Sequence, residues 1–262
     1  MKTLISVAAL AATLGASGAT MAAAQSQASP GDPALSFTLR GGVASGPAYF
    51  GAEEYEYAPD LGFKFHSINI GPLAFGDPDP QAPKRGFGVG GSFRYIGLRD
   101  ASEYDLLTGL DDIDPAYELG LGVSYATQNF SAFADLRRGF GGHQGVVGEL
   151  GADVTLQASS EVTLTMGPRA LFGDAEFTDT YFGVSSSEAS ALNPAYDAEG
   201  GLVSVGAEIV MTYQINDDWG IETGLTWDRY MNDAADSPIV ENGRRDDLGA
   251  RVGLTRNIQL GF

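Results

Sequence analysis

The sequence contains no cysteine and only two histidines, His66 and His143. Without cysteine there is no disulfide scaffold, no thiol catalysis, no cysteine-ligated zinc and no lipid attachment at an N-terminal cysteine. Basic residues are also scarce: 15 Lys and Arg stand against 34 Asp and Glu, for a formal net charge of −19. Nucleic-acid binding needs a basic surface, so we expect no nucleic-acid partner.

Long apolar runs are scarce as well. The run at 4–16 follows Lys2 and precedes the small residues Ala22-Ala23-Ala24, a pattern typical of a secretory signal peptide. The run is too short to cross a bilayer as a mature helix. We therefore predict a signal peptide at 1–24, a short periplasmic segment at 25–33 and a mature domain at 34–262 without a transmembrane helix.

The mature chain is instead rich in glycine, at 36 residues, and in alternating patterns. Apolar residues at every second position, as in 117–125, alternate with glycine, serine or charged residues, which predicts β-strands with one apolar face. The pattern predicts ten strands near 34–45, 57–70, 86–96, 116–126, 129–138, 145–157, 161–172, 201–213, 218–230 and 247–262.

The length of these strands favours a transmembrane antiparallel β-barrel over a secreted soluble β-barrel. Strands of soluble sheets usually hold about 5–6 residues, whereas a tilted strand needs about 9–11 to cross a bilayer. Aromatic residues at the strand ends fit interfacial girdles, and they are Tyr117, Tyr125, Tyr213, Trp219, Trp227 and Phe262. Lipid offers no partner for a strand edge, so we expect a closed barrel.

The segment 67–85 leaves the strand number open. Residues 68–70 and 73–75 could form an extra hairpin arm, which would make twelve strands possible. The prolines that follow, between 78 and 83, are incompatible with a strand because they donate no ladder hydrogen bond. Short polar turns after 126, 157 and 215 are expected on the periplasmic side, and the long connections 96–115, 172–200 and 231–246 outside.

Charged residues on the polar faces should point into a narrow lumen. We expect them to pair and to plug it, because buried charges are tolerated when they are paired. The predicted lumenal charge network comprises Arg94, Arg169, Arg251, Glu118, Glu149 and Glu208. The alternative is a small cation-preferring pore, since on these faces Asp135, Asp153, Glu222 and Asp228 join the acids while only Lys64 and Arg137 join the bases.

Catalytic and metal motifs are weak. The chain has no Gly-x-Ser-x-Gly element to accompany His66 or His143, so we predict no catalytic residues and no cofactor. The acidic stretch 100–114 lacks the spacing of a calcium loop, so we predict a solvated surface and no metal site. Ile258, Leu260 and Phe262 form an apolar row at the end of the last strand. From this pattern and its resemblance to the ends of other outer-membrane barrels, we predict that the row is the assembly signal for the outer-membrane insertion machinery.

Five blocks resemble the MipA/OmpV family of MltA-interacting outer-membrane proteins. They are Gly46-Pro47-Ala48-Tyr49-Phe50-Gly51, the acidic block 107–113, Tyr181-Phe182-Gly183-Val184-Ser185, Asn193-Pro194-Ala195-Tyr196 and the block 233–240. One departure is the C-terminus, Leu260-Gly261-Phe262, where the family usually has an aromatic–basic–Phe ending. The resemblance covers roughly residues 34–262.

The resemblance implies a non-enzymatic barrel in the outer membrane of a Gram-negative cell, surrounded by outer-membrane lipid. Some family members are described as scaffolds that join a murein hydrolase, a lytic transglycosylase, to a murein synthase. Others are linked to adhesion or to stress and antibiotic responses. We therefore expect a structural or scaffold protein of the cell envelope, with a small transport or stress-response channel as the alternative.

Overall fold

The computed structural model describes residues 33–70, 73–77, 79 and 85–261. The predicted signal peptide, nearly all of the segment predicted at 25–33 and Phe262 lie outside these residues. The described strands are β1 (Leu35–Pro47), β2 (Tyr55–Ile70), β3 (Leu73–Gly76), β4 (Gly86–Ile96), β5 (Ala116–Ala126), β6 (Phe130–Gly141), β7 (Val146–Gln157), β8 (Val162–Gly173), β9 (Gly201–Gln214), β10 (Trp219–Tyr230) and β11 (Asp246–Leu260). Ten of them lie within three residues of the predicted ranges at both ends.

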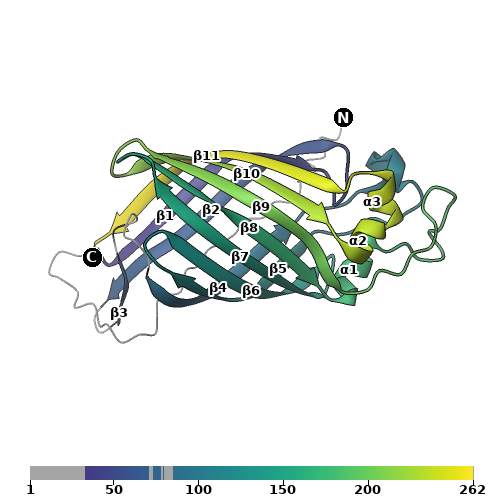
Figure 1. Ribbon diagram of the computed structural model, residues 1–262, viewed down its shortest axis with the longest axis horizontal. Coiled ribbons are helices and arrows are strands. Elements are labelled where there is room, and N and C mark those ends of the chain that lie inside the picture. The colour runs from purple at the N-terminus through teal and green to yellow at the C-terminus, as the bar shows by residue number, and fades with distance from the viewer. Residues whose placement is uncertain (1–32, 71–72, 78, 80–84, 262) are drawn as a thin grey trace.

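The strands form one antiparallel sheet that curls into a barrel (Figure 1). Its order is β3-β2-β1-β11-β10-β9-β8-β7-β6-β5-β4. The first and last long strands pair along most of their length, from Leu35 opposite Leu260 to Ser45 opposite Ala250. The wall is therefore continuous between the first and the last long strand, as an up-and-down barrel requires.

The extra hairpin arm is present. Its strand β3 pairs with the end of β2 over Ser67–Ile70, which adds a short eleventh strand to ten long ones. The expectation of full closure is wrong for the described residues, because there β2 and β4 form no ladder with each other. Pro59 in β2 has no backbone N–H to donate, which makes this strand a poor edge for a further ladder.

The outer surface of the wall is apolar, as the alternating pattern requires. Large side chains stand exposed along neighbouring strands, with Leu121 at 68%, Leu136 at 62% and Leu225 at 59%. Water-soluble proteins rarely expose such continuous apolar surface, whereas the hydrocarbon of a bilayer would cover it. Within the described part of the chain, no helix has the length and apolar character needed to cross a membrane.

Aromatic side chains border this apolar surface. Near one rim the rings of Tyr95 and Tyr117 lie 5.1 Å apart, and near the other those of Phe87 and Tyr125 lie 4.9 Å apart. Arg256, which interrupts the apolar row of β11, places its guanidinium 4.6 Å from the centre of the Trp219 ring. This contact suits a membrane interface, where an arginine can keep its charge near water.

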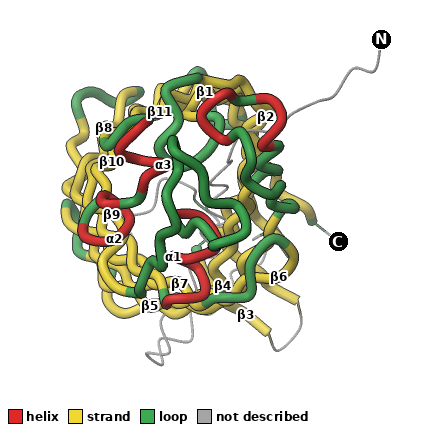
Figure 2. The backbone as a smooth tube through the Cα atoms, turned by 90° about the vertical axis from the view of Figure 1, so that its right-hand side faces the viewer, coloured by secondary structure: helices red, strands yellow, loops and turns green. Residues whose placement is uncertain are grey.

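The two ends of the barrel differ. Tight turns at 127–129, 158–161 and 215–218 form one end, which we call the turn end. The long connections fold over the other end and contain α1 (Ala175–Phe182), α2 (Asn232–Asp236), α3 (Pro238–Asn242) and the 3₁₀ turns η1 (Ala101–Glu103) and η2 (Asp105–Leu107). We call the segments 48–54, 97–115, 142–145, 174–200 and 231–245 the cap, and Figure 2 shows them lying across the mouth.

Candidate functional site: the lumenal charge network and the cap

One group of paired charges lies on the inner faces of β4 to β7. The Glu118 carboxylate, fully buried, accepts hydrogen bonds from Arg94 at 2.5 and 2.9 Å and from Nε of Arg137 at 2.9 Å. Arg137, whose side chain is only 1% exposed, also reaches Glu149 at 2.7 Å and Asp135 at 3.5 Å. Two guanidiniums and three carboxylates thus interlock across four neighbouring strands, with charge-assisted hydrogen bonds at most contacts.

A second group crosses the other side of the lumen. Arg169 contacts Asp153 at 2.8 Å and Glu208 at 2.9 Å. Arg251 contacts the same Glu208 at 2.7 Å and Glu222 at 3.5 Å. These ion pairs join β7 to β11 through shared carboxylates.

The second group continues through Arg40 of β1. Its guanidinium pairs with Asp60 of β2, with the closest N–O distance 2.7 Å, and with Glu222 of β10. Asp60 is 2% exposed, so this contact lies deep within the wall. Arg40 thereby extends the network across the strands on both sides of the β1–β11 junction.

Each of the six residues of the predicted network takes part in an ion pair. Arg94 meets Glu118, whereas Arg169 and Arg251 share Glu208. Glu149 is held by Arg137, which stood among the inward charges but outside the predicted six. The prediction missed Arg40 and Asp60, although Arg40 continues the inward row of Thr38 and Gly42 in the sequence.

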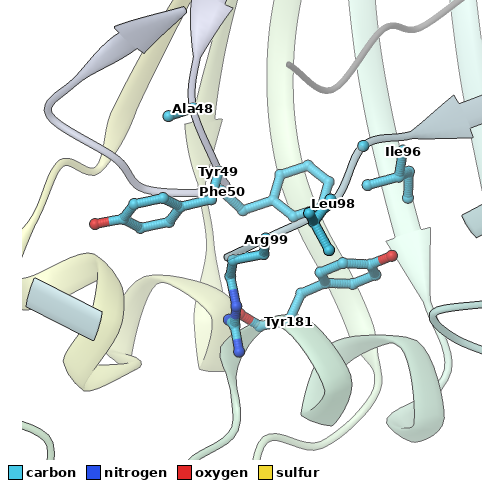
Figure 3. A pocket seen from close by; sticks show the side chains of 8 residues that line it. Ala48, Tyr49, Phe50, Ile96, Leu98, Arg99 and Tyr181 are labelled. Carbon is cyan, nitrogen blue, oxygen red and sulfur yellow. The ribbon is translucent and has the colours of Figure 1, made fainter. Parts of the chain in front are cut away.

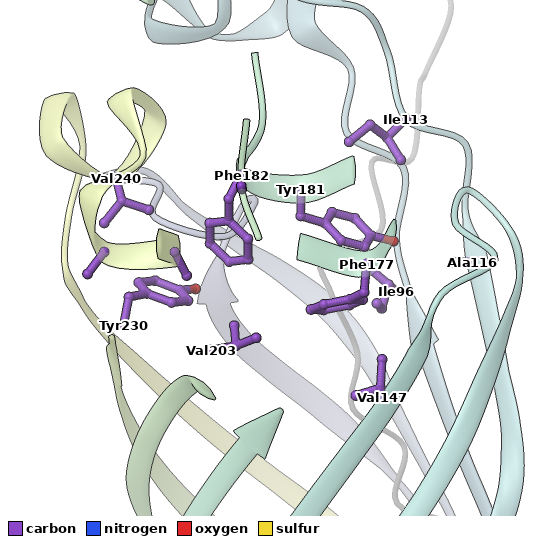
Figure 4. Packing of buried hydrophobic residues seen from close by; sticks show 13 residues of the cluster. Ile96, Ile113, Ala116, Val147, Phe177, Tyr181, Phe182, Val203, Tyr230 and Val240 are labelled. Carbon is purple, nitrogen blue, oxygen red and sulfur yellow. The ribbon is translucent and has the colours of Figure 1, made fainter. Parts of the chain in front are cut away.

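The cap contains two clusters of buried apolar side chains. One includes Phe177, Phe182, Tyr230 and Val240 (Figure 4). The partly buried Phe50 packs against this cluster. The ring of Phe50 lies 5.7 Å from that of Phe182 and 6.4 Å from that of Tyr230. The second cluster includes Tyr49, Leu107, Leu110, Val184 and Ile239. Apolar packing of this kind gives the cap a core of its own.

These clusters account for the five sequence blocks. The first contributes Tyr49 and Phe50, and the others contribute Leu107 and Leu110, Tyr181 to Val184, Tyr196, and Ala234 to Val240. Polar contacts join the blocks further: the Ser237 hydroxyl donates to the Phe182 carbonyl at 2.6 Å, and the Tyr196 hydroxyl donates to the Asp233 carbonyl at 2.9 Å. The blocks are far apart in the sequence, and each supplies one part of the cap core.

His143 lies where the cap meets the network. Its ring is 2% exposed, and Nε2 lies 3.2 Å from the buried Glu118 carboxylate. The same ring lies 5.1 Å from the ring of Phe177 in α1. Gly139 makes room for it, because a Cβ there would lie 2.2 Å from the His143 ring. His143 therefore packs α1 onto the charged lumen below.

Burial also affects ionisation in the cap. The pKa of Tyr49 is raised to about 12, first by burial and then by the nearby Glu54 carboxylate. The pKa of Tyr181 is raised in the same direction, again chiefly by burial. The interior of the cap is thus a medium in which charged side chains are costly.

The residues considered for metal binding and catalysis have structural contacts. Within the described chain no group of three or more His, Cys, Asp or Glu side chains could hold a metal ion. In the acidic stretch, Asp100 accepts from the Ser102 amide at 3.0 Å and Asp112 from the Ala101 amide at 2.8 Å. At the turn end, His66 shares a 2.6 Å hydrogen bond with the Thr38 hydroxyl.

The predicted assembly signal lies at the β1–β11 junction. Ile258 is paired with Phe37 and Leu260 with Leu35, so both residues belong to the ladder that joins β1 to β11. Phe262 lies outside the described residues. A role of this strand end in insertion stays a prediction.

Comparison with known proteins identifies the family. The model of the family "MltA-interacting protein MipA" matches residues 39–258, nearly all of the barrel and the cap. The chain belongs to the MipA family. The resemblance seen in the five blocks is therefore confirmed.

Two curated relatives are outer-membrane proteins of Vibrio species. Omp26La of Vibrio anguillarum and OmpV of Vibrio cholerae are each 36% identical to this chain over 81 residues, which are 31% of this chain and 31% of each relative. The matched part thus spans about a third of those proteins. Like other members of the MipA family, this protein is an outer-membrane β-barrel.

Solved structures of similar shape are also outer-membrane barrels. The NanC porin has a TM-score of 0.38 and 10% identity, with 84% of this chain and 98% of that chain covered. A Pseudomonas aeruginosa FadL homologue has a TM-score of 0.38 and 8% identity, with 97% and 100% covered.

Proposed function

We propose that this protein is a non-enzymatic structural barrel of the outer membrane, with a lumen closed to ions, that serves as a scaffold through its exposed loops and turns. The proposal rests on two features that close the lumen. Paired charges fill the inner wall, and a cap with its own apolar core covers one mouth. A transporter of hydrated ions would need a continuous polar path, which both features oppose.

The partner class comes from the family. Its model describes members as interacting with MltA, and we extend to this chain a link with periplasmic murein hydrolase or synthase. The surface for such a partner would be the turn end, which we expect to face the periplasm. It carries exposed polar residues, including Ser160, Glu161 and Asp217, on turns held by local hydrogen bonds.

Site-specific photo-cross-linking in intact envelopes tests this proposal. A photoreactive residue replaces Ser160 on the turn end and, as the matched control, Ser187 on the cap; both positions are exposed serines in tight polar turns. The proposal predicts that the Ser160 position captures a murein-remodelling enzyme and the Ser187 position does not. Capture of the same enzyme from Ser187 alone, or no capture of such an enzyme from the turn end, would contradict it.

One observation favours the alternative of a small cation-preferring pore. Asp228 and Asp247 are direct ladder partners in β10 and β11, and no basic side chain lies within ion-pair distance of either in the described residues. Asp247 accepts a hydrogen bond from the Tyr230 hydroxyl. These acids place two carboxyl groups without a basic partner below the cap, and such groups would attract cations if water reached and ionised them.

A further inference from the structure

A small pocket lies inside the cap where three segments meet. It is lined by Tyr49 and Phe50 of the segment 48–54, by Ile96 at the end of β4 with the following residues 97–99, and by Tyr181 of α1 (Figure 3). Its free volume is about 10 Å³, enough for the centre of one water-sized species. The walls are mostly apolar, and the Tyr49 and Tyr181 hydroxyls point away from the centre (Figure 3).

Arg99 is the charged residue of this pocket. It is 7% exposed and donates to two backbone carbonyls, Tyr181 at 3.2 Å and Asp111 at 3.5 Å. Its Nε is buried and has no hydrogen-bond acceptor. Interior arginines elsewhere in the described chain are matched by carboxylates, namely Arg40, Arg94, Arg137, Arg169 and Arg251. Arg99 has no carboxylate within ion-pair distance among the described residues.

The carboxylates nearest to Arg99 compensate its positive charge only in part. Burial lowers the pKa of Arg99, although the more distant Glu188 and Asp112 carboxylates act in the opposite direction. Both carboxylates are occupied locally: Glu188 accepts from the Asp111 and Ser185 amides, and Asp112 from the Ala101 amide. A buried cation without a close partner is costly, so a mobile anion would stabilise the folded cap.

We infer that this pocket binds a small, weakly hydrated monovalent anion, with chloride the best fit, at the free Nε–H of Arg99. The small space favours a single-atom ion over sulfate or phosphate, and the apolar walls penalise ions that hold their water tightly. The bound anion would tie together the connections 48–54 and 97–115 and helix α1. Because it binds only the folded cap, it slows local opening by a factor that grows as 1 + [Cl⁻]/Kd.

The test is amide hydrogen exchange in the purified, folded full chain in detergent. Exchange is compared in sodium chloride and sodium sulfate at equal ionic strength, in the wild type and in Arg99→Gln. Arg138→Gln is the matched control, since Arg138 is an exposed arginine at the same end of the barrel. The inference predicts slower exchange at 97–113 and 175–182 in chloride for the wild type and Arg138→Gln, and no chloride effect for Arg99→Gln.

Equal exchange in the two salts for the wild type would overturn the inference, as would a chloride effect that survives in Arg99→Gln. If Arg99→Gln fails to fold, crystals of the wild type soaked in bromide provide the second measurement. An anomalous peak beside Nε of Arg99 supports the site. Density for water alone at that position, with no anomalous signal, rejects it.

Discussion

Glu118→Gln perturbs the lumenal network at its most shared carboxylate. Glu118 is fully buried and holds both Arg94, at 2.5 Å, and Arg137, at 2.9 Å. The amide keeps the size of the side chain but removes its charge. Two buried guanidiniums then face a neutral group, and only Arg137 keeps other carboxylates, Glu149 and Asp135.

The expected loss of stability follows from burial. Removing one partner of a buried ion pair costs about 3–5 kcal/mol, because the remaining charge stays desolvated. Arg137 keeps its 2.7 Å contact with Glu149, so we expect the lower part of that range, about 3 kcal/mol. Asp246→Asn is the matched control: its pair with Arg229 is 39% and 46% exposed, and exposed pairs contribute about 0–1 kcal/mol.

The assay is denaturant unfolding of the purified proteins in detergent micelles, followed by tryptophan fluorescence. A double-mutant cycle with Arg94→Gln then measures the coupling between the two side chains. We expect the double variant to lose less than the sum of the single losses, because the uncompensated charge is removed with its partner. A midpoint for Glu118→Gln that moves no further than that of Asp246→Asn, at equal slope, would refute the reasoning.

Three further predictions concern the wall, the cap and assembly. Arg169→Ala should lower the unfolding midpoint, since Asp153 loses its 2.8 Å partner and Glu208 keeps only Arg251; an unchanged midpoint would contradict this. The pKa of Tyr49 is raised to about 12, so the folded cap favours the neutral phenol. The contribution of this phenol to the stability of the cap is complete below its usual pKa near 10 and is lost as the pH rises towards 12. Tyr49→Phe should therefore weaken the alkaline increase in hydrogen exchange of the cap, and an equal increase in both proteins would refute it. Deletion of Phe262 should reduce the amount of barrel that reaches the outer membrane, measured by the mobility of unboiled samples on gels; normal yield would count against the assembly signal.

The sequence predicted the wall well because a barrel strand repeats a simple pattern. The alternation in 117–125 sets which side chains face lipid and which face the lumen, so Glu118 could be placed inside without coordinates. Which inward charges pair with one another could not be predicted in the same way. The pairs depend on the stagger of neighbouring strands, which brings Glu149 to Arg137 rather than to one of the predicted arginines.

The cap was missed for a different reason. Helices α1, α2 and α3 hold five to eight residues each, too few for a clear helical period in the sequence. Their stability comes from packing between distant segments, as when Phe50 meets Phe182 and Tyr230. The useful signal was the apolar content of the five blocks, aromatic in three of them and aliphatic in the other two, which lie in the connections and yet pack into a core.

Single-channel recording tests the central claim, that paired charges and the cap close the lumen. Purified, folded wild-type protein is inserted into planar bilayers and recorded beside Arg169→Ala. The account predicts no discrete conductance steps for the wild type, whatever the cation. Stable, cation-selective steps from the wild type, together with an Arg169→Ala barrel of unchanged stability and higher conductance, would contradict it and establish a pore.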